Sequence, residues 1–77
     1  MPTIHRENGL EFYFFADDHN PAHLHIEKGS AEAKILIETG EVIFNHGLKA
    51  KELKKAVEII EENKALFLIK FREFINE

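Results

Sequence analysis

A chain of 77 residues, with 44% hydrophobic and 31% charged residues, has the length and composition of one folded domain and not of a disordered segment. We therefore expect a single domain over residues 1–77. The net charge of −4 does not support nucleic acid as a partner, because nucleic-acid-binding proteins usually carry a basic surface. The absence of cysteine excludes disulfide bonds and thiolate metal sites. No apolar segment is long enough to span a membrane, and the first residues lack the apolar core of a signal peptide, so we expect a cytoplasmic protein without membrane contact.

The N-terminal part of the chain predicts a β-hairpin. Residues Thr3 to His5 form a short strand candidate, and Asn8-Gly9 is a typical two-residue hairpin turn, because both residues accept positive φ. The next strand, Leu10 to Ala16, is rich in aromatic residues and apolar on both faces. This pattern favours a strand in the middle of a sheet.

A histidine-rich stretch follows this hairpin. Asp17 to Pro21 has the composition of a loop. The strand after it, His23 to Glu27, alternates in polarity, with Leu24 and Ile26 on one face and the two histidines on the other.

Gly29-Ser30 predicts the turn of a second hairpin, since a type II′ turn takes glycine at its first central position. This turn pairs Leu24 with Ile35 on the apolar face and His25 with Lys34 on the other face. A shift by one residue would mix the two faces, which favours this register.

Thr39-Gly40 predicts a third tight turn, which would pair Ile37 with Val42 and Ile35 with Phe44. The result is a meander of three antiparallel strands. Its apolar face includes Val42 and Phe44 and needs a cover.

The C-terminal part of the chain predicts helix, because neither glycine nor proline occurs after Lys49. Apolar residues recur there at helical spacing in two sets: Leu53, Ala56, Val57 and Ile60, then Phe67, Phe71, Phe74 and Ile75. One bent helix or two helices fit this pattern, and a break near Asn63 is favoured because asparagine can cap a helix. We expect an α+β fold, in which a small antiparallel sheet of the N-terminal strands and the meander is covered on one face by this helical segment. His23, His25 and Glu27 then lie on the face turned away from the core.

The histidine spacing admits a metal site. His23 and His25 point the same way from one strand and would present ring nitrogens to one ion. Asp18 and His19 in the preceding loop would complete the ligand set of a divalent metal such as zinc. The simpler interpretation is that the histidines are half-exposed strand residues and that Asp18 or His19 bonds the loop backbone.

The same residues admit acid–base chemistry without a metal. His19, His23 and His25 would supply a general base and a general acid for cleavage of a phosphodiester or nucleotide, and Lys34 would neutralise the phosphate. The sequence leaves open whether the protein is an enzyme and which of these four residues is catalytic.

Residues 18–25 form an Asp-His-x-Pro-x-His-x-His motif. With this motif and the segments 12–14 and 71–74, the chain resembles the domain of unknown function 4160 family of small prokaryotic proteins. The resemblance covers nearly the whole chain and rests mainly on the motif. Members of that family are often encoded beside a second small protein, of the domain of unknown function 2442 family, which implies a two-protein, toxin–antitoxin-like complex.

Two functional hypotheses result. In the first, the protein is a binding component of such a complex, with a small protein partner and a histidine-rich surface site. In the alternative, it is a small metal-dependent or acid–base hydrolase that acts through His19, His23 and His25.

Overall fold

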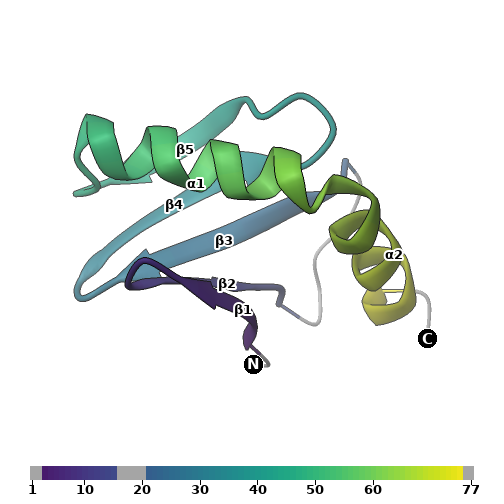
Figure 1. Cartoon of the computed structure of the whole chain (residues 1–77). Coiled ribbons are helices and arrows are strands. Elements are labelled where there is room, and N and C mark those ends of the chain that lie inside the picture. The colour runs from purple at the N-terminus through teal and green to yellow at the C-terminus, as the bar shows by residue number, and fades with distance from the viewer. Residues whose placement is uncertain (1–2, 16–20, 76–77) are drawn as a thin grey trace.

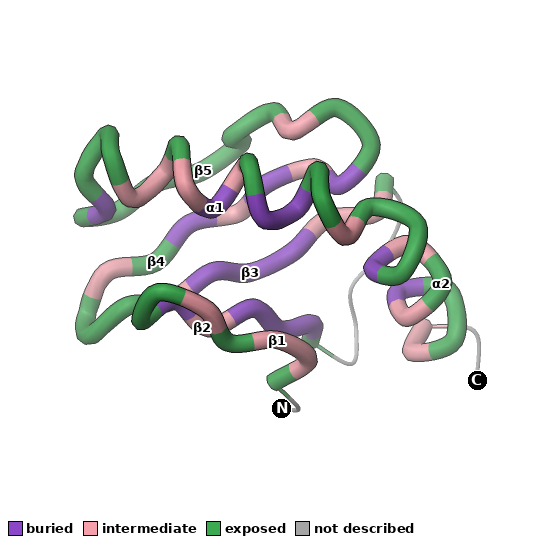
Figure 2. Tube along the Cα trace, in the orientation of Figure 1, coloured by how far each residue is buried: buried purple, intermediate pink, exposed green. Residues whose placement is uncertain are grey.

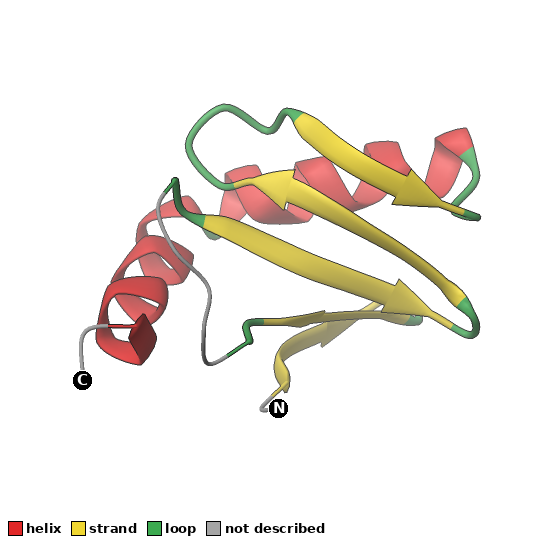
Figure 3. Ribbon diagram, turned by 180° about the vertical axis from the view of Figure 1, so that it is seen from behind, coloured by secondary structure: helices red, strands yellow, loops and turns green. Residues whose placement is uncertain are grey.

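The computed structural model describes residues 3–15 and 21–75 and contains a five-stranded antiparallel sheet followed by two helices (Figure 1). The strands are β1 (Thr3–Glu7), β2 (Leu10–Tyr13), β3 (His23–Lys28), β4 (Ala31–Leu36) and β5 (Val42–His46), and the helices are α1 (Ala50–Glu62) and α2 (Lys64–Ile75). Neighbouring strands follow one another in the chain, so the sheet is a meander. Seen from behind, α1 runs along the far side of the sheet, and α2 lies beside the end of the sheet (Figure 3). The predicted α+β fold with helices on one face is confirmed.

The first two hairpins form as the sequence predicts. Asn8 and Gly9 both have positive φ, 54° and 77°, and join β1 to β2. Gly29, with φ of 61°, begins the turn between β3 and β4. The pairs Leu24–Ile35 and His25–Lys34 occur in the predicted register.

Strand β2 is central, as predicted, but shorter than expected. It lies between β1 and β3 and ends at Tyr13 instead of continuing to Ala16, which lies outside the described residues. Phe12 and Tyr13 point to opposite faces and both are buried. This strand therefore has covered side chains on both faces of the sheet.

The predicted pairing of β4 with β5 is wrong. Ile35 pairs with Val42, and Lys34 pairs with Phe44, with a bulge between these two pairs. The reason is a longer turn than Thr39-Gly40 predicts: the amide of Leu36 donates to the carbonyl oxygen of Glu41 at 2.8 Å, and the amide of Gly40 donates to the carbonyl oxygen of Leu36 at 2.9 Å. Ile37 lies in the turn between β4 and β5, so it does not stand opposite Val42. As a result, Val42 and Phe44 lie outside the core, and β5 is exposed along its length (Figure 2).

The helices bury their apolar sides against the sheet. In α1 the buried residues are Ala56, Ile59 and Ile60, and in α2 they are Phe67 and Phe71. Phe67 packs against Phe12 with ring centroids 6.1 Å apart. No helix in the described ranges is long and apolar enough to cross a membrane.

The helical segment breaks at Asn63, as predicted, but the cap acts on α1. The side-chain amide of Asn63 donates to the carbonyl oxygen of Ile59 at 2.8 Å and so adds to the bond at 3.1 Å that the backbone amide of Asn63 makes to the same oxygen at the end of α1. The start of α1 is held by Glu52, whose carboxylate accepts the backbone amide of Lys49 at 2.9 Å. Lys28 also donates to this carboxylate at 2.9 Å and holds the pKa of Glu52 below its usual value.

Candidate functional site

The two histidines of β3 lie next to each other, as the sequence predicts. Their ring centroids are 5.2 Å apart. The Nδ1–H group of His23 donates to the carbonyl oxygen of Pro21 at 3.0 Å, so a metal or proton-transfer role for His23 would use its Nε2 atom. The His23 ring also approaches Phe71 of α2, with centroids 5.9 Å apart.

His25 lies on the predicted face but is not a surface residue, because it is only 5% exposed. Its ring stacks on Tyr13, the residue opposite it on β2, at 5.4 Å and with 14° between the ring planes. Phe15 packs edge-on against it at 4.4 Å. These three residues and His23 form an aromatic group on the face of the sheet away from α1, which we call the back cluster. Burial in the back cluster gives His25 a packing role, since aromatic pairs of this geometry stabilise a fold.

Lys34 lies opposite His25 on β4, as predicted. Its ammonium group is 5.7 Å from the ring centroid of Phe44 on β5, within the range of a cation–π contact. Lys34 therefore reaches toward the edge of the sheet on the side away from β3.

The predicted metal site falls partly on residues that the structure does not describe. Asp18 and His19 lie outside the described ranges, so the ligand set with His23 and His25 stays a prediction. Within residues 3–15 and 21–75, no group of three or more histidine, aspartate and glutamate side chains is arranged to hold a metal ion.

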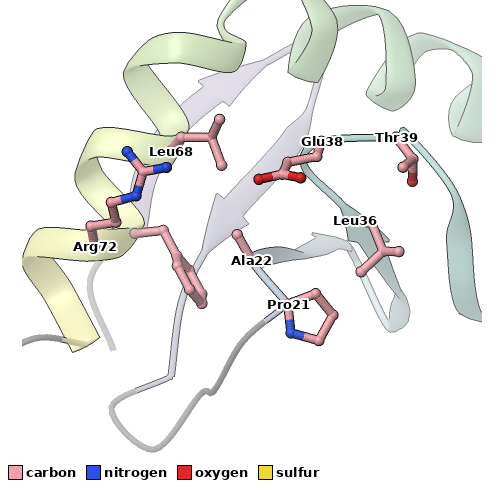
Figure 4. Close-up of a pocket in the computed structure, with 8 residues that line it drawn as sticks. Pro21, Ala22, Leu36, Glu38, Thr39, Leu68 and Arg72 are labelled. Atoms are coloured by element: carbon pink, nitrogen blue, oxygen red, sulfur yellow. The ribbon is translucent and has the colours of Figure 1, made fainter.

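A small cavity lies beside the motif, between α2 and the loop that joins β4 to β5 (Figure 4). Its volume is about 160 Å³. It is lined by Pro21, Ala22, Leu36, Glu38, Thr39, Leu68, Phe71 and Arg72. Pro21 and Ala22, in the middle of the motif, therefore form one wall of the cavity. Sequence reasoning missed this cavity because its walls come from three separate segments.

Strand β5 is the second feature that sequence reasoning missed. Val42, Ile43 and Phe44 are 37%, 49% and 44% exposed, at one edge of the sheet. The only sequence signal for this exposure was the run of three apolar residues, which does not distinguish a buried strand from an apolar edge.

Comparison with known proteins identifies the family. The model of the family described as a domain of unknown function (DUF4160) matches residues 9–72, which include every residue that lines the cavity and the whole of β5. No curated protein and no solved structure matches the chain. Since the family model covers most of the sequence, the chain belongs to the domain of unknown function 4160 family.

Proposed function

We propose that this protein is the binding component of a two-protein, toxin–antitoxin-like complex, and that its partner adds a β-strand alongside β5. The observation that carries the proposal is the apolar, exposed edge of the sheet at β5. An open strand edge presents backbone amide and carbonyl groups in a row, to which an extended segment of another protein can pair. The gene neighbourhood typical of the family supports a small protein as this partner.

The two edges of the sheet differ in a way that favours β5. Natural edge strands are usually protected from pairing by charged side chains, proline, short length or bulges. The edge strand β1 carries Arg6 and Glu7 and has a register shift. Strand β5 contains no lysine, arginine, aspartate, glutamate or proline, and the one protective feature it shows is the bulge at Ile43. The less protected edge is thus the apolar one.

Strand β5 presents apolar groups on both faces of the sheet. Val42 pairs with Ile35, whose side chain lies in the core under the helices, so Val42 is on the helix side. Phe44 pairs with Lys34 and lies on the opposite side. A partner strand beside β5 would therefore gain apolar contacts above and below the plane of the sheet, in addition to backbone hydrogen bonds. The net charge of −4 favours a basic partner.

The test is co-expression with the neighbouring small protein, followed by size-exclusion chromatography and measurement of the Kd. We expect a complex that elutes as one species at micromolar concentration. Ile43→Lys should weaken it at least about ten-fold, since it places a charge on an apolar contact. Ile69→Lys on α2 is the matched control, because Ile69 is 51% exposed and Ile43 is 49% exposed. Separate elution of the two wild-type proteins, or equal effects of the two substitutions, would contradict the proposal.

One observation favours hydrolysis as a second candidate function, namely the closeness of the His23 and His25 rings, at 5.2 Å. Titration with Zn²⁺ or Ni²⁺, followed through the histidine NMR signals, tests the metal-dependent form of this function. Shifts of His19, His23 and His25 together would support it. Unchanged histidine signals would remove a metal site from consideration and leave only acid–base chemistry, which a phosphodiesterase assay of His23→Ala would test.

A further inference from the structure

We propose that the cavity between α2 and the loop after β4 binds a free α-amino acid with an apolar side chain. Glu38 would accept hydrogen bonds from its ammonium group, and Arg72 would donate to its carboxylate. This site lies apart from β5, and its existence does not depend on the proposed protein partner.

The charges around the cavity carry this inference. Glu38 comes from the loop after β4, and Arg72 comes from α2, so the two charges are on different walls. In Figure 4 the carboxylate of Glu38 is turned toward α2. In the described part of the chain, neither side chain forms an ion pair, with each other or with a third residue. Both side chains are exposed, and one anion and one cation at the same cavity match a ligand that carries both charges.

The space between these charges is apolar and small. Leu36, Leu68 and Phe71 line it, and Phe71 is fully buried. A cavity of about 150 Å³ lined by apolar side chains is known to hold a benzene-sized group. The volume of about 160 Å³ therefore suits one side chain of the size of leucine or phenylalanine. Sites for nucleotides and other larger ligands are usually about 300–1,000 Å³, so the cavity is too small for them.

The walls of the cavity are held by backbone hydrogen bonds. The amide of Ile37 donates to the carbonyl oxygen of Ala22 at 3.0 Å, which ties the loop to the motif. The amide of Gly40 donates to the carbonyl oxygen of Leu36 at 2.9 Å, and the amide of Glu41 donates to the Thr39 hydroxyl oxygen at 3.2 Å. Because the loop backbone is already ordered, the entropy cost of binding would lie mainly in ordering the side chains of Glu38 and Arg72. A guanidinium group is also well suited to a carboxylate, which it can bind through two parallel hydrogen bonds.

The experiment is an NMR titration of the ¹⁵N-labelled full chain with L-leucine, N-acetyl-L-leucine and L-leucinamide. The second compound lacks the ammonium group, and the third lacks the carboxylate. We expect saturable shifts at the amides of Ala22, Thr39 and Leu68 with L-leucine, and affinities at least about ten-fold weaker for both analogues. If L-leucine causes no shift up to its solubility limit, the proposal is wrong. If N-acetyl-L-leucine binds as tightly as L-leucine, the cavity takes the C-terminal residue of a peptide instead, and the proposal is again wrong.

Substitutions test the two charges separately. Glu38→Gln and Arg72→Gln should each weaken L-leucine binding about ten-fold, because each removes one charge-assisted contact. Glu41→Gln in the same loop and Lys64→Gln on the same helix are the controls, since both residues are exposed and neither lines the cavity. Equal binding by all four variants would overturn the proposal. Each spectrum also reports whether the variant is folded, and the analogue series tests the proposal on the unaltered chain.

Discussion

The register of β5 leads to a prediction about two large apolar side chains, those of Ile37 and Phe44. Ile37→Ala should destabilise the fold more than Phe44→Ala, although removing a phenylalanine side chain ordinarily costs at least as much as removing an isoleucine side chain. Ile37 is 1% exposed, whereas Phe44 is 44% exposed. The difference in burial should reverse the usual order.

The magnitudes follow from the burial. Ile37→Ala removes three buried carbon groups, each worth about 0.8 kcal/mol, and the cavity left behind raises the loss to about 3 kcal/mol. Phe44→Ala removes a half-exposed ring and leaves no enclosed cavity, so its cost should be about 1–1.5 kcal/mol. With about 0.05–0.15 kcal/mol per residue, a domain of 77 residues has a free energy of unfolding of about 4–12 kcal/mol. Both variants should therefore fold.

Urea unfolding followed by circular dichroism measures both free energies of unfolding. If Ile37→Ala leaves too little folded protein, Ile37→Val replaces it, with an expected loss of about 1 kcal/mol. A loss of about 3–5 kcal/mol for Phe44→Ala would mean that Phe44 is in the core and that β5 pairs with β4 in the other register. That result would refute the reasoning about β5.

Three further predictions concern the loop after β4 and the ends of α1. Gly40→Ala should lower the free energy of unfolding by about 1–3 kcal/mol, because φ is +78° and the added Cβ would lie 3.2 Å from Val57; thermal unfolding measures it. Asn63→Ala should cost about 1 kcal/mol in the same assay, since it removes one side-chain hydrogen bond at the end of α1. The hydrogen bond from Lys28 lowers the pKa of Glu52. The ionised Glu52 should therefore stabilise the fold above the usual glutamate pKa, and this stabilisation should be lost as the pH falls through the lowered pKa. Glu52→Gln should flatten this part of the pH dependence of stability, and an unchanged profile would contradict the role of this contact.

The part of the sheet that the sequence predicted correctly is the part that local information determines. The register of β3 and β4 follows from a two-residue turn and from the alternation of apolar residues on both strands. The register of β5 could not be predicted from a turn and an alternation of this kind. It depends on a turn that runs from Leu36 to Glu41 and on a bulge at Ile43, whereas the Thr39-Gly40 pair predicts a shorter turn without a bulge.

The candidate site was likewise predictable only where local sequence information determines it. Alternation along β3 placed His23 and His25 together on the face opposite the core, and they lie 5.2 Å apart. The burial of His25 was not predictable, because it depends on ring contacts with Tyr13 and Phe15, which have no local signal. The cavity was missed for a similar reason, since the direction of α2 decides whether Arg72 and Glu38 face the same space.

The role of β5 in binding a partner is tested most directly by hydrogen exchange. Amide exchange at residues 42–46 would be measured in the free protein and in the complex with the neighbouring small protein. Pairing of a partner strand with β5 should slow exchange at the outward-facing amides of this strand, because they would gain hydrogen-bond acceptors. Slowed exchange elsewhere in the sheet or the helices, with residues 42–46 unchanged, would contradict the proposal that β5 is the binding edge.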